Sequence, residues 1–243
     1  MKRVDSVISL IYSMSKAEKK AFSVQMLKDK EEKDYLVIYD IITKSKQLDS
    51  KNVKGEFHKR RPGGSFEVSI QYLYERLTDS LLTLRKKKDI YYDLLNNLCK
   101  ARMLYERSLF EECFEILSDT IEQATYYENN EVLTIALKLE LEYLLRLNFP
   151  NLAESELYHK HFMQNEALKK TRKIVEQSSL HNLLKYRLSH IGSIRTSKQK
   201  QDMNDLMVNE LSIAASSGIE GNFELMRNHR LFQANYLMGA GEY

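Results

Sequence analysis

The histidines of this 243-residue chain form no arrangement suited to catalysis. There are six, and only His159 and His161 lie close together in the sequence. On a helix, residues two apart point about 200° apart, so these two imidazoles are not placed to share a metal ion. The chain has no His-Glu-x-x-His motif and no paired cysteine motif of the zinc-binding kind. We therefore predict a protein that is not an enzyme, with surface histidines, no metal site and no cofactor.

Cys99 and Cys113 are too few for a disulfide framework, and we interpret them as reduced thiols in a cytoplasmic protein. They fall on two successive predicted helices, which favours a role in core packing. The segment 62–64, Pro-Gly-Gly, is typical of a loop. It lacks the preceding strand and the Lys-Ser/Thr pair that a phosphate-binding loop requires. The N-terminus shows no signal peptide.

Residues 44–61 are the most basic segment, with seven Lys and Arg against only Asp49 and Glu56. Helices predicted over 33–45 and 50–58 resemble a helix-turn-helix, whose second helix would enter a groove of nucleic acid. The alternatives are a solvated charged face and docking to an acidic protein. Under the first interpretation, nucleic acid is contacted by Lys51, Lys54, Lys59, Arg60 and Arg61.

The composition favours an all-α fold. The chain has 8 Gly and 2 Pro, too few for the turns of an all-β fold, and its 43% hydrophobic content argues against disorder. Residues 1–90 carry 20 Lys and Arg against 13 Asp and Glu, whereas the remainder carries 17 against 21. This asymmetry suggests two regions with different roles. The apolar runs are far shorter than the roughly 18–20 residues that span a bilayer, so we expect no membrane segment.

Apolar residues at helical spacing predict five helices in the N-terminal region, over about 5–14, 15–29, 32–44, 50–58 and 65–87. Ser15 and Glu18 form a capping box at the start of the second helix. Asp49 or Ser50 caps the fourth helix, and Ser65 caps the fifth. We place an N-terminal helical domain at 1–88.

The remaining chain, 89–243, reads as helices paired by short turns. We predict them over about 89–106, 110–127, 130–148, 150–173, 180–192, 199–216 and 223–238. The pair Asn129-Asn130 is expected to break the chain and cap the third of these helices, and Pro150 to occupy the first turn of the fourth.

Small and bulky residues follow a spaced order from Ala101 to Thr120. The small ones are Ala101, Cys113 and Thr120, and the bulky ones are Leu104, Phe110 and Leu117, with Ser108 at the turn. This pattern resembles the tetratricopeptide repeat, a pair of antiparallel helices in about 34 residues. It implies units over about 94–127, around Ala136 and Leu139, over about 175–216, and from Asn222. Residues 10–20 resemble the opening of uncharacterised bacterial proteins that place a small helical domain before such repeats, a likeness that implies no known activity.

Gly241 and Tyr243 are similar to the residues that open the second helix of a repeat. We therefore expect the chain to stop in mid-repeat and to be part of a longer protein.

The resemblance implies an α-α superhelix of degenerate repeats whose first helices line a concave groove. A groove that mixes aliphatic and charged side chains suits a peptide or helix from another protein. The alternative is that the same residues pack against other parts of their own protein. By register, this face holds Arg102, Glu106, Leu133, Leu137, Glu140 and Leu141.

The leading hypothesis is a non-catalytic scaffold or adaptor that binds a partner protein on the concave repeat face. The alternative is a nucleic-acid-binding regulator with a helix-turn-helix-like basic N-terminal domain and a repeat domain that senses a signal or dimerises. The alternative predicts an affinity that falls steeply with salt. The sequence does not indicate the oligomeric state.

Overall fold

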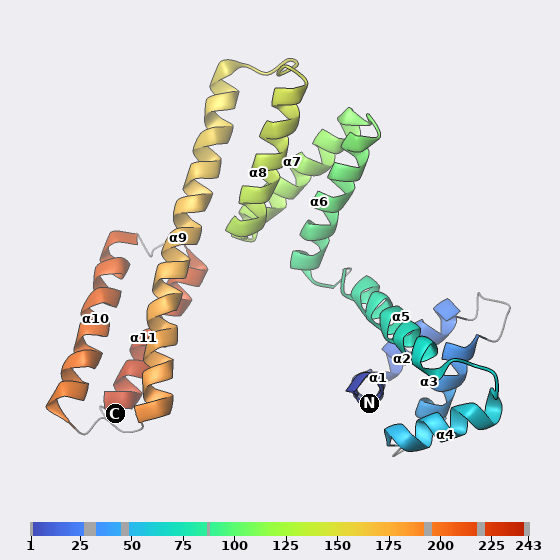
Figure 1. Ribbon diagram of the computed structural model, residues 1–243. Helices are drawn as coiled ribbons and strands as arrows, with labels where there is room; N and C mark the ends of the chain where they lie inside the picture. Colours follow the sequence, from blue (N-terminus) through green and yellow to red (C-terminus); the bar gives the residue numbers. More distant parts are fainter. Residues whose placement is uncertain are drawn as a thin grey trace. The chain divides into compact units, whose positions relative to one another are not determined.

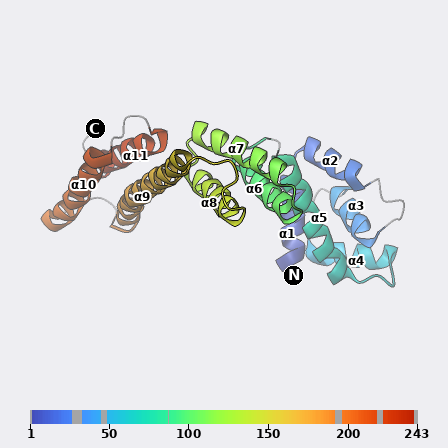
Figure 2. The ribbon, with the colours of Figure 1, turned by 90° about the horizontal axis from the view of Figure 1, so that it is seen from above.

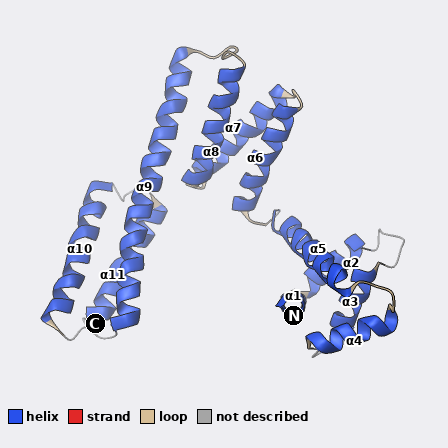
Figure 3. Cartoon of the chain, in the orientation of Figure 1, coloured by secondary structure: helices blue, strands red, loops and turns tan. Residues whose placement is uncertain are grey.

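The computed structural model describes residues 2–26, 33–44, 49–86, 88–191, 196–217 and 222–240. These residues form eleven α-helices joined by loops and turns, with no strand among them, so the expectation of an all-α protein is confirmed (Figures 1 and 3). The chain divides into two compact units, Met1–Asp93 and Leu94–Tyr243. Within the described ranges, no helix combines the length and apolarity needed to cross a membrane.

Unit 1 contains five helices, and α5 packs against each of the other four. Its apolar core includes the fully buried side chains of Phe22, Phe57 and Leu73. This unit is held together by one apolar interior to which every helix contributes an inward face. The helices are α1 (Lys2–Ser13), α2 (Lys16–Met26), α3 (Asp34–Lys44), α4 (Ser50–Arg60) and α5 (Phe66–Lys86).

Local capping chemistry sets two of the helix starts in unit 1 as the sequence predicts. The Ser15 amide donates to Glu18 Oε2 over 2.8 Å, and the Glu18 amide donates to Ser15 Oγ over 3.2 Å. The hydrogen bonds that Glu18 accepts from the Ser15 amide and hydroxyl lower the pKa of its carboxyl. Asp49 caps α4 by accepting from the Asn52 amide over 2.8 Å. Both arrangements satisfy amides that a helix start leaves without a partner.

Unit 2 is built around α8 and α9. The helix α8 packs against α7 and α9, and α9 continues past α8 to pack against α10 and α11 (Figures 1 and 2). The predicted cap of α8 is present, and of the pair Asn129-Asn130 it is Asn129 that accepts from the Val132 amide over 3.1 Å. The helices are α6 (Ile90–Glu106), α7 (Phe110–Tyr126), α8 (Asn130–Arg146), α9 (Glu154–Ile191), α10 (Ser197–Ser217) and α11 (Phe223–Ala240).

The helices α6, α7 and α8 repeat with a regular spacing. Each has 17 residues, and they begin at Ile90, Phe110 and Asn130, 20 positions apart. Two positions after the end of each helix lies a residue with positive φ, namely Ser108 (61°), Glu128 (54°) and Asn148 (59°). The next amide after each donates back across the turn, from Leu109 to Leu104, from Asn129 to Ala124 and from Phe149 to Leu144. This is the hydrogen-bond pattern of a Schellman helix end.

The spacing corrects the repeat register inferred from the sequence. A helix pair occupies 40 residues here, against about 34 in the tetratricopeptide repeat. Ala101 lies five residues before the end of α6, whereas Ala136 lies ten before the end of α8, so the two do not occupy equivalent positions. Both are nevertheless fully buried.

Two predicted helices, over 150–173 and 180–192, are one helix of 38 residues, α9. The stretch between them has β-branched residues and serines but no Gly or Pro, and such residues weaken a helix by less than about 1 kcal/mol each. Packing on α8 at one end and on α10 and α11 at the other outweighs that weakness. The predicted unit over 175–216 therefore begins inside a helix. Pro150 lies in the turn before α9 rather than in its first turn. The expected half-repeat at Gly241 and Tyr243 lies outside the described residues.

Candidate functional site

The basic residues predicted to contact nucleic acid lie on or next to α4, where neighbouring carboxylates neutralise most of them. Lys54 Nζ lies 2.5 Å from Glu67 of α5, and Lys59 Nζ lies 3.3 Å from Glu56 of α4. Arg60 Nη1 lies 3.1 Å from Asp40, and Arg61 Nε lies 3.7 Å from Asp34, both on α3. Among the five predicted contacts, only Lys51 makes no ion pair with a described residue.

An open cleft of about 390 Å³ lies where α4 faces α3. Asp40 lies beside it and bridges Lys44 and Arg60. Burial opposes ionisation of this carboxyl, but the hydrogen bonds and charges of Lys44 and Arg60 outweigh burial and lower its pKa. The cleft therefore keeps an excess of positive charge, but Asp40 and Glu56 pair with three of its four cations. Its walls are formed by Ile41, Lys44, Lys51, Asn52, Gly55, Glu56, Lys59 and Arg60.

The Pro-Gly-Gly loop after α4 packs closely against the core. A Cβ atom at Gly64 would lie 2.8 Å from Asp34 Oδ2 and 2.9 Å from Phe57 Cζ. Because real side chains do not tolerate such contacts, glycine is needed for the loop to pass over Phe57. Close packing accounts for this glycine without any bound phosphate.

The residues predicted for the concave groove separate into an exposed pair and an interior set. Arg102 and Glu106 are exposed on α6 and pair with each other, Nε to Oε1, at 3.1 Å. On α8, Leu137 is 1% exposed, Glu140 is 6% exposed and Leu141 is half-buried. Leu133 is buried as well.

Glu140 of α8 forms an ion pair within unit 2. Its Oε1 lies 2.8 Å from Lys160 Nζ of α9, which ties α8 to α9. Nearby, Tyr143 of α8 stacks on Tyr105 of α6, with ring centroids 3.7 Å apart. Burial raises the pKa of Tyr143. Leu137 and Glu140 therefore lie in the interior of unit 2, whereas the predicted repeat register placed them on an outer face. Partner binding by these residues stays a prediction.

A surface that the sequence prediction missed lies on α7. This helix has five carboxylates and no Lys or Arg. With 3.6 residues per turn, the five lie within about 100° of the helix circumference, opposite its buried face. All five are exposed, and none forms an ion pair with any residue that the structure describes. This acidic stripe consists of Glu111, Glu112, Glu115, Asp119 and Glu122.

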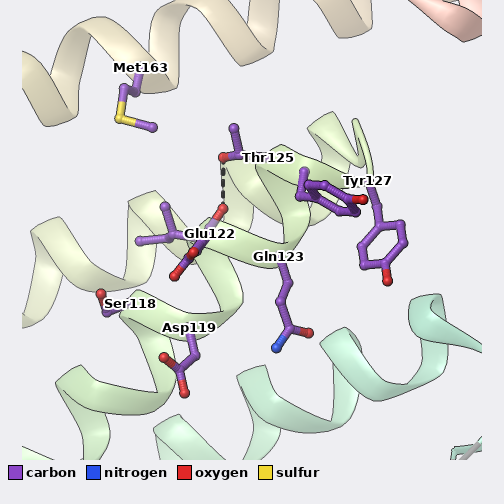
Figure 4. Close-up of a pocket in the computed structure, with 9 residues that line it drawn as sticks. Ser118, Asp119, Glu122, Gln123, Thr125, Tyr127 and Met163 are labelled. Carbon is purple, nitrogen blue, oxygen red and sulfur yellow. Dashed lines mark hydrogen bonds between the residues drawn. The ribbon is translucent and has the colours of Figure 1, made fainter.

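The C-terminal half of the acidic stripe borders an open cleft of about 900 Å³ between α7 and α9. The close-up shows Thr125 on the side of α7 that faces Met163 of α9, with Asp119 and Gln123 on the far side (Figure 4). Tyr126 and Tyr127 line it where α7 ends, with rings 5.0 Å apart and perpendicular. Tyr126 is 79% exposed. The cleft thus combines half-buried apolar groups, exposed aromatic rings and carboxylates.

Two further predictions concern the cysteines. Cys113 is buried in unit 2 as expected, and burial raises the pKa of its thiol, partly offset by a hydrogen bond to the Tyr105 backbone. Cys99 is exposed, so the expected core role does not hold for this residue.

One histidine belongs to a buried polar cluster that the sequence did not reveal. His229 Nδ1 of α11 lies 2.8 Å from Glu210 Oε1 of α10, which also accepts from Gln177 Nε2 of α9 over 3.1 Å. Glu210 is fully buried. This cluster links three helices whose shared apolar core is small. A buried carboxylate requires hydrogen-bonding partners, and Glu210 takes them from two other helices. We therefore interpret the cluster as a set of hydrogen bonds that hold α9, α10 and α11 together.

Within the described ranges, no group of three or more His, Cys, Asp and Glu residues is placed to hold a metal ion. No protein-family model, curated protein or solved structure matches the chain.

Proposed function

We propose that this protein is a non-catalytic interaction scaffold that binds a segment of a partner protein on unit 2. The observation that carries the proposal is the cleft between α7 and α9 with exposed tyrosines at its edge. Tyrosine supplies a large amphipathic contact area and is enriched among residues that dominate binding energy. Tyr158 and Phe162 add exposed aromatic side chains on the same half of α9.

The proposal includes a helical-repeat architecture for unit 2. The regular spacing of α6, α7 and α8, with the same turn geometry at each end, supports an array of helix pairs. Such arrays present the surfaces of successive helices to partners. The proposed repeats resemble tetratricopeptide repeats in being pairs of helices, but each pair spans 40 residues rather than about 34. The binding surface is moved from the first helices of the pairs to α7 and α9.

Nucleic-acid binding by unit 1 is the second candidate, and the cleft between α3 and α4 favours it. Four cationic side chains line that cleft. Three of them, Lys44, Lys59 and Arg60, already pair with Asp40 or Glu56. Phosphate binding would have to compete with these carboxylates, so we rank this candidate below the scaffold.

The experiment is capture of partners by the tagged chain from cells that express it naturally, with and without nuclease, followed by mass spectrometry. The scaffold proposal expects a stoichiometric protein that survives nuclease and is lost in the Tyr126→Ala/Tyr127→Ala variant. A Lys51→Ala/Lys59→Ala variant is the matched control and should retain the partner. Partners that disappear with nuclease, or in the lysine variant alone, would contradict the scaffold and favour the second candidate.

A further inference from the structure

The acidic stripe on α7 is not explained by the stability of the helix itself. Carboxylates in the first turn interact favourably with the helix dipole, which accounts for Glu111 and Glu112. Asp119 and Glu122 lie in the second half of α7, where that interaction is unfavourable. Glu111, Glu115 and Asp119 also follow one another at intervals of four, a spacing at which like charges repel.

The neighbouring elements do not neutralise the stripe either. The helix α7 turns the buried side chains of Cys113, Leu117 and Ala124 inward, and α8 packs on this helix. Its outer face is left with five exposed carboxylates, and the described residues supply no cation to them. A concentrated negative surface next to an apolar cleft is complementary to a ligand with the opposite charge and an apolar group.

We propose that the outer face of α7 docks a basic segment of another protein. Lys or Arg side chains of that segment pair with Glu115, Asp119 and Glu122, and one apolar side chain enters the cleft between Ile121 and Met163. The tyrosines at the end of α7 cover the inserted side chain. This inference rests on the proposed function and adds to it the chemical class of the partner.

The charge distribution selects this occupant over the two others considered. Nucleic acid is a polyanion, and the stripe repels it. A second copy of this chain is nearly neutral overall, with 37 Lys and Arg against 34 Asp and Glu, and most of the cations of its basic helix α4 already pair with carboxylates of their own unit. A foreign basic segment is therefore the occupant to which the proposal commits.

The test titrates the whole chain with a labelled 20-residue amphipathic peptide that has lysines on one face and a single phenylalanine anchor. Fluorescence anisotropy is read at low and at physiological salt. We expect binding that weakens with salt, and a loss of about tenfold or more in the Glu115→Lys/Asp119→Lys variant. The control, Asp202→Lys/Asp205→Lys, changes the net charge equally on exposed residues of α10 and should bind within about twofold of the wild type.

Three results of the titration would overturn the inference: equal losses in both variants, no loss in the α7 variant, or equal binding of a peptide with serine in place of the anchor. Self-association of the chain that the α7 variant abolishes would assign the face to a second copy and overturn it too. If Glu115→Lys/Asp119→Lys does not fold, Glu115→Gln/Asp119→Asn replaces it. A captured partner that the α7 variant retains would refute this inference alone, whereas absence of any nuclease-resistant partner would refute the proposed function.

Discussion

The helices α4 and α7 both concentrate charge of one sign in the sequence, but only α7 keeps that charge uncompensated in the fold. Around α4, three carboxylates from other helices, Asp34, Asp40 and Glu67, meet the cations. Around α7, the described residues supply no cation to any of the five carboxylates. A run of like charges in a sequence therefore says little about the field at a surface until the neighbouring elements are placed.

The difference arises from what packs beside each helix. The helix α4 lies in a five-helix unit where α3 and α5 both bring acidic residues to its edges. The helix α7 buries apolar side chains on its inner face, where α8 packs, and its five carboxylates are exposed on the opposite face. Charge that is neutralised in place stabilises a fold, whereas charge left uncompensated is available to a partner.

The largest expected effects test whether both helices are anchored by their inner faces. Phe57→Ala in α4 and Leu117→Ala in α7 remove fully buried side chains. We expect each to lower the free energy of unfolding by about 2–5 kcal/mol, through lost burial and the cavity that remains. Denaturant unfolding followed by circular dichroism measures the loss. The matched surface variant Tyr126→Ala should stay within about 0.5 kcal/mol of the wild type. A loss at Leu117 as small as at Tyr126 would mean that α7 is not held in the orientation that exposes the stripe.

A smaller effect separates the two helices by pH. The pKa of Asp40 is lowered from its ordinary value of 3.8, so its ion pairs stabilise the folded state above that pH. This contribution is lost as the pH falls through the lowered pKa. Asp40→Asn should therefore reduce stability at pH 7, within the roughly 0.2–1 kcal/mol typical of exposed pairs, and its difference from the wild type should shrink as the pH falls from 4 toward 2. Thermal unfolding between pH 7 and pH 2 checks this. A constant difference at every pH would show that Asp40 acts through packing and not through its charge.

Features set by nearby residues were predictable from the sequence, whereas features set by distant contacts were not. The capping box of Ser15 and Glu18 and the cap at Asn129 involve residues three apart, and both predictions are confirmed. The continuity of α9 depends on helices on either side of it, so propensity alone predicted a break that is absent.

The features of the candidate site also separate into those visible in the sequence and those that depend on distant contacts. Glu111, Glu115 and Asp119 recur at intervals of four in the sequence. The sequence prediction of a charged site considered only the basic residues of 44–61. That this stripe is unpaired, and that Glu140 pairs inward with Lys160, follows only from the tertiary fold. The groove inferred from a 34-residue repeat therefore combined the exposed Arg102 and Glu106 with the buried Leu133, Leu137 and Glu140.

The smallest effects come from removing single surface charges, and their signs should be opposite in the two regions. Glu115→Gln relieves repulsion from Glu111 and Asp119, so we expect α7 to gain about 0.2–0.5 kcal/mol in stability. Glu56→Gln removes the partner of Lys59 and a neighbour of Arg60, so unit 1 should lose a similar amount. Both changes should shrink in 1 M salt, where the Debye length is about 3 Å. Denaturant midpoints of the two variants at low and high salt measure these differences. If Glu115→Gln destabilises the chain and the loss disappears in salt, α7 has a cationic neighbour. That result would refute the claim that the charge on α7, unlike that on α4, is uncompensated.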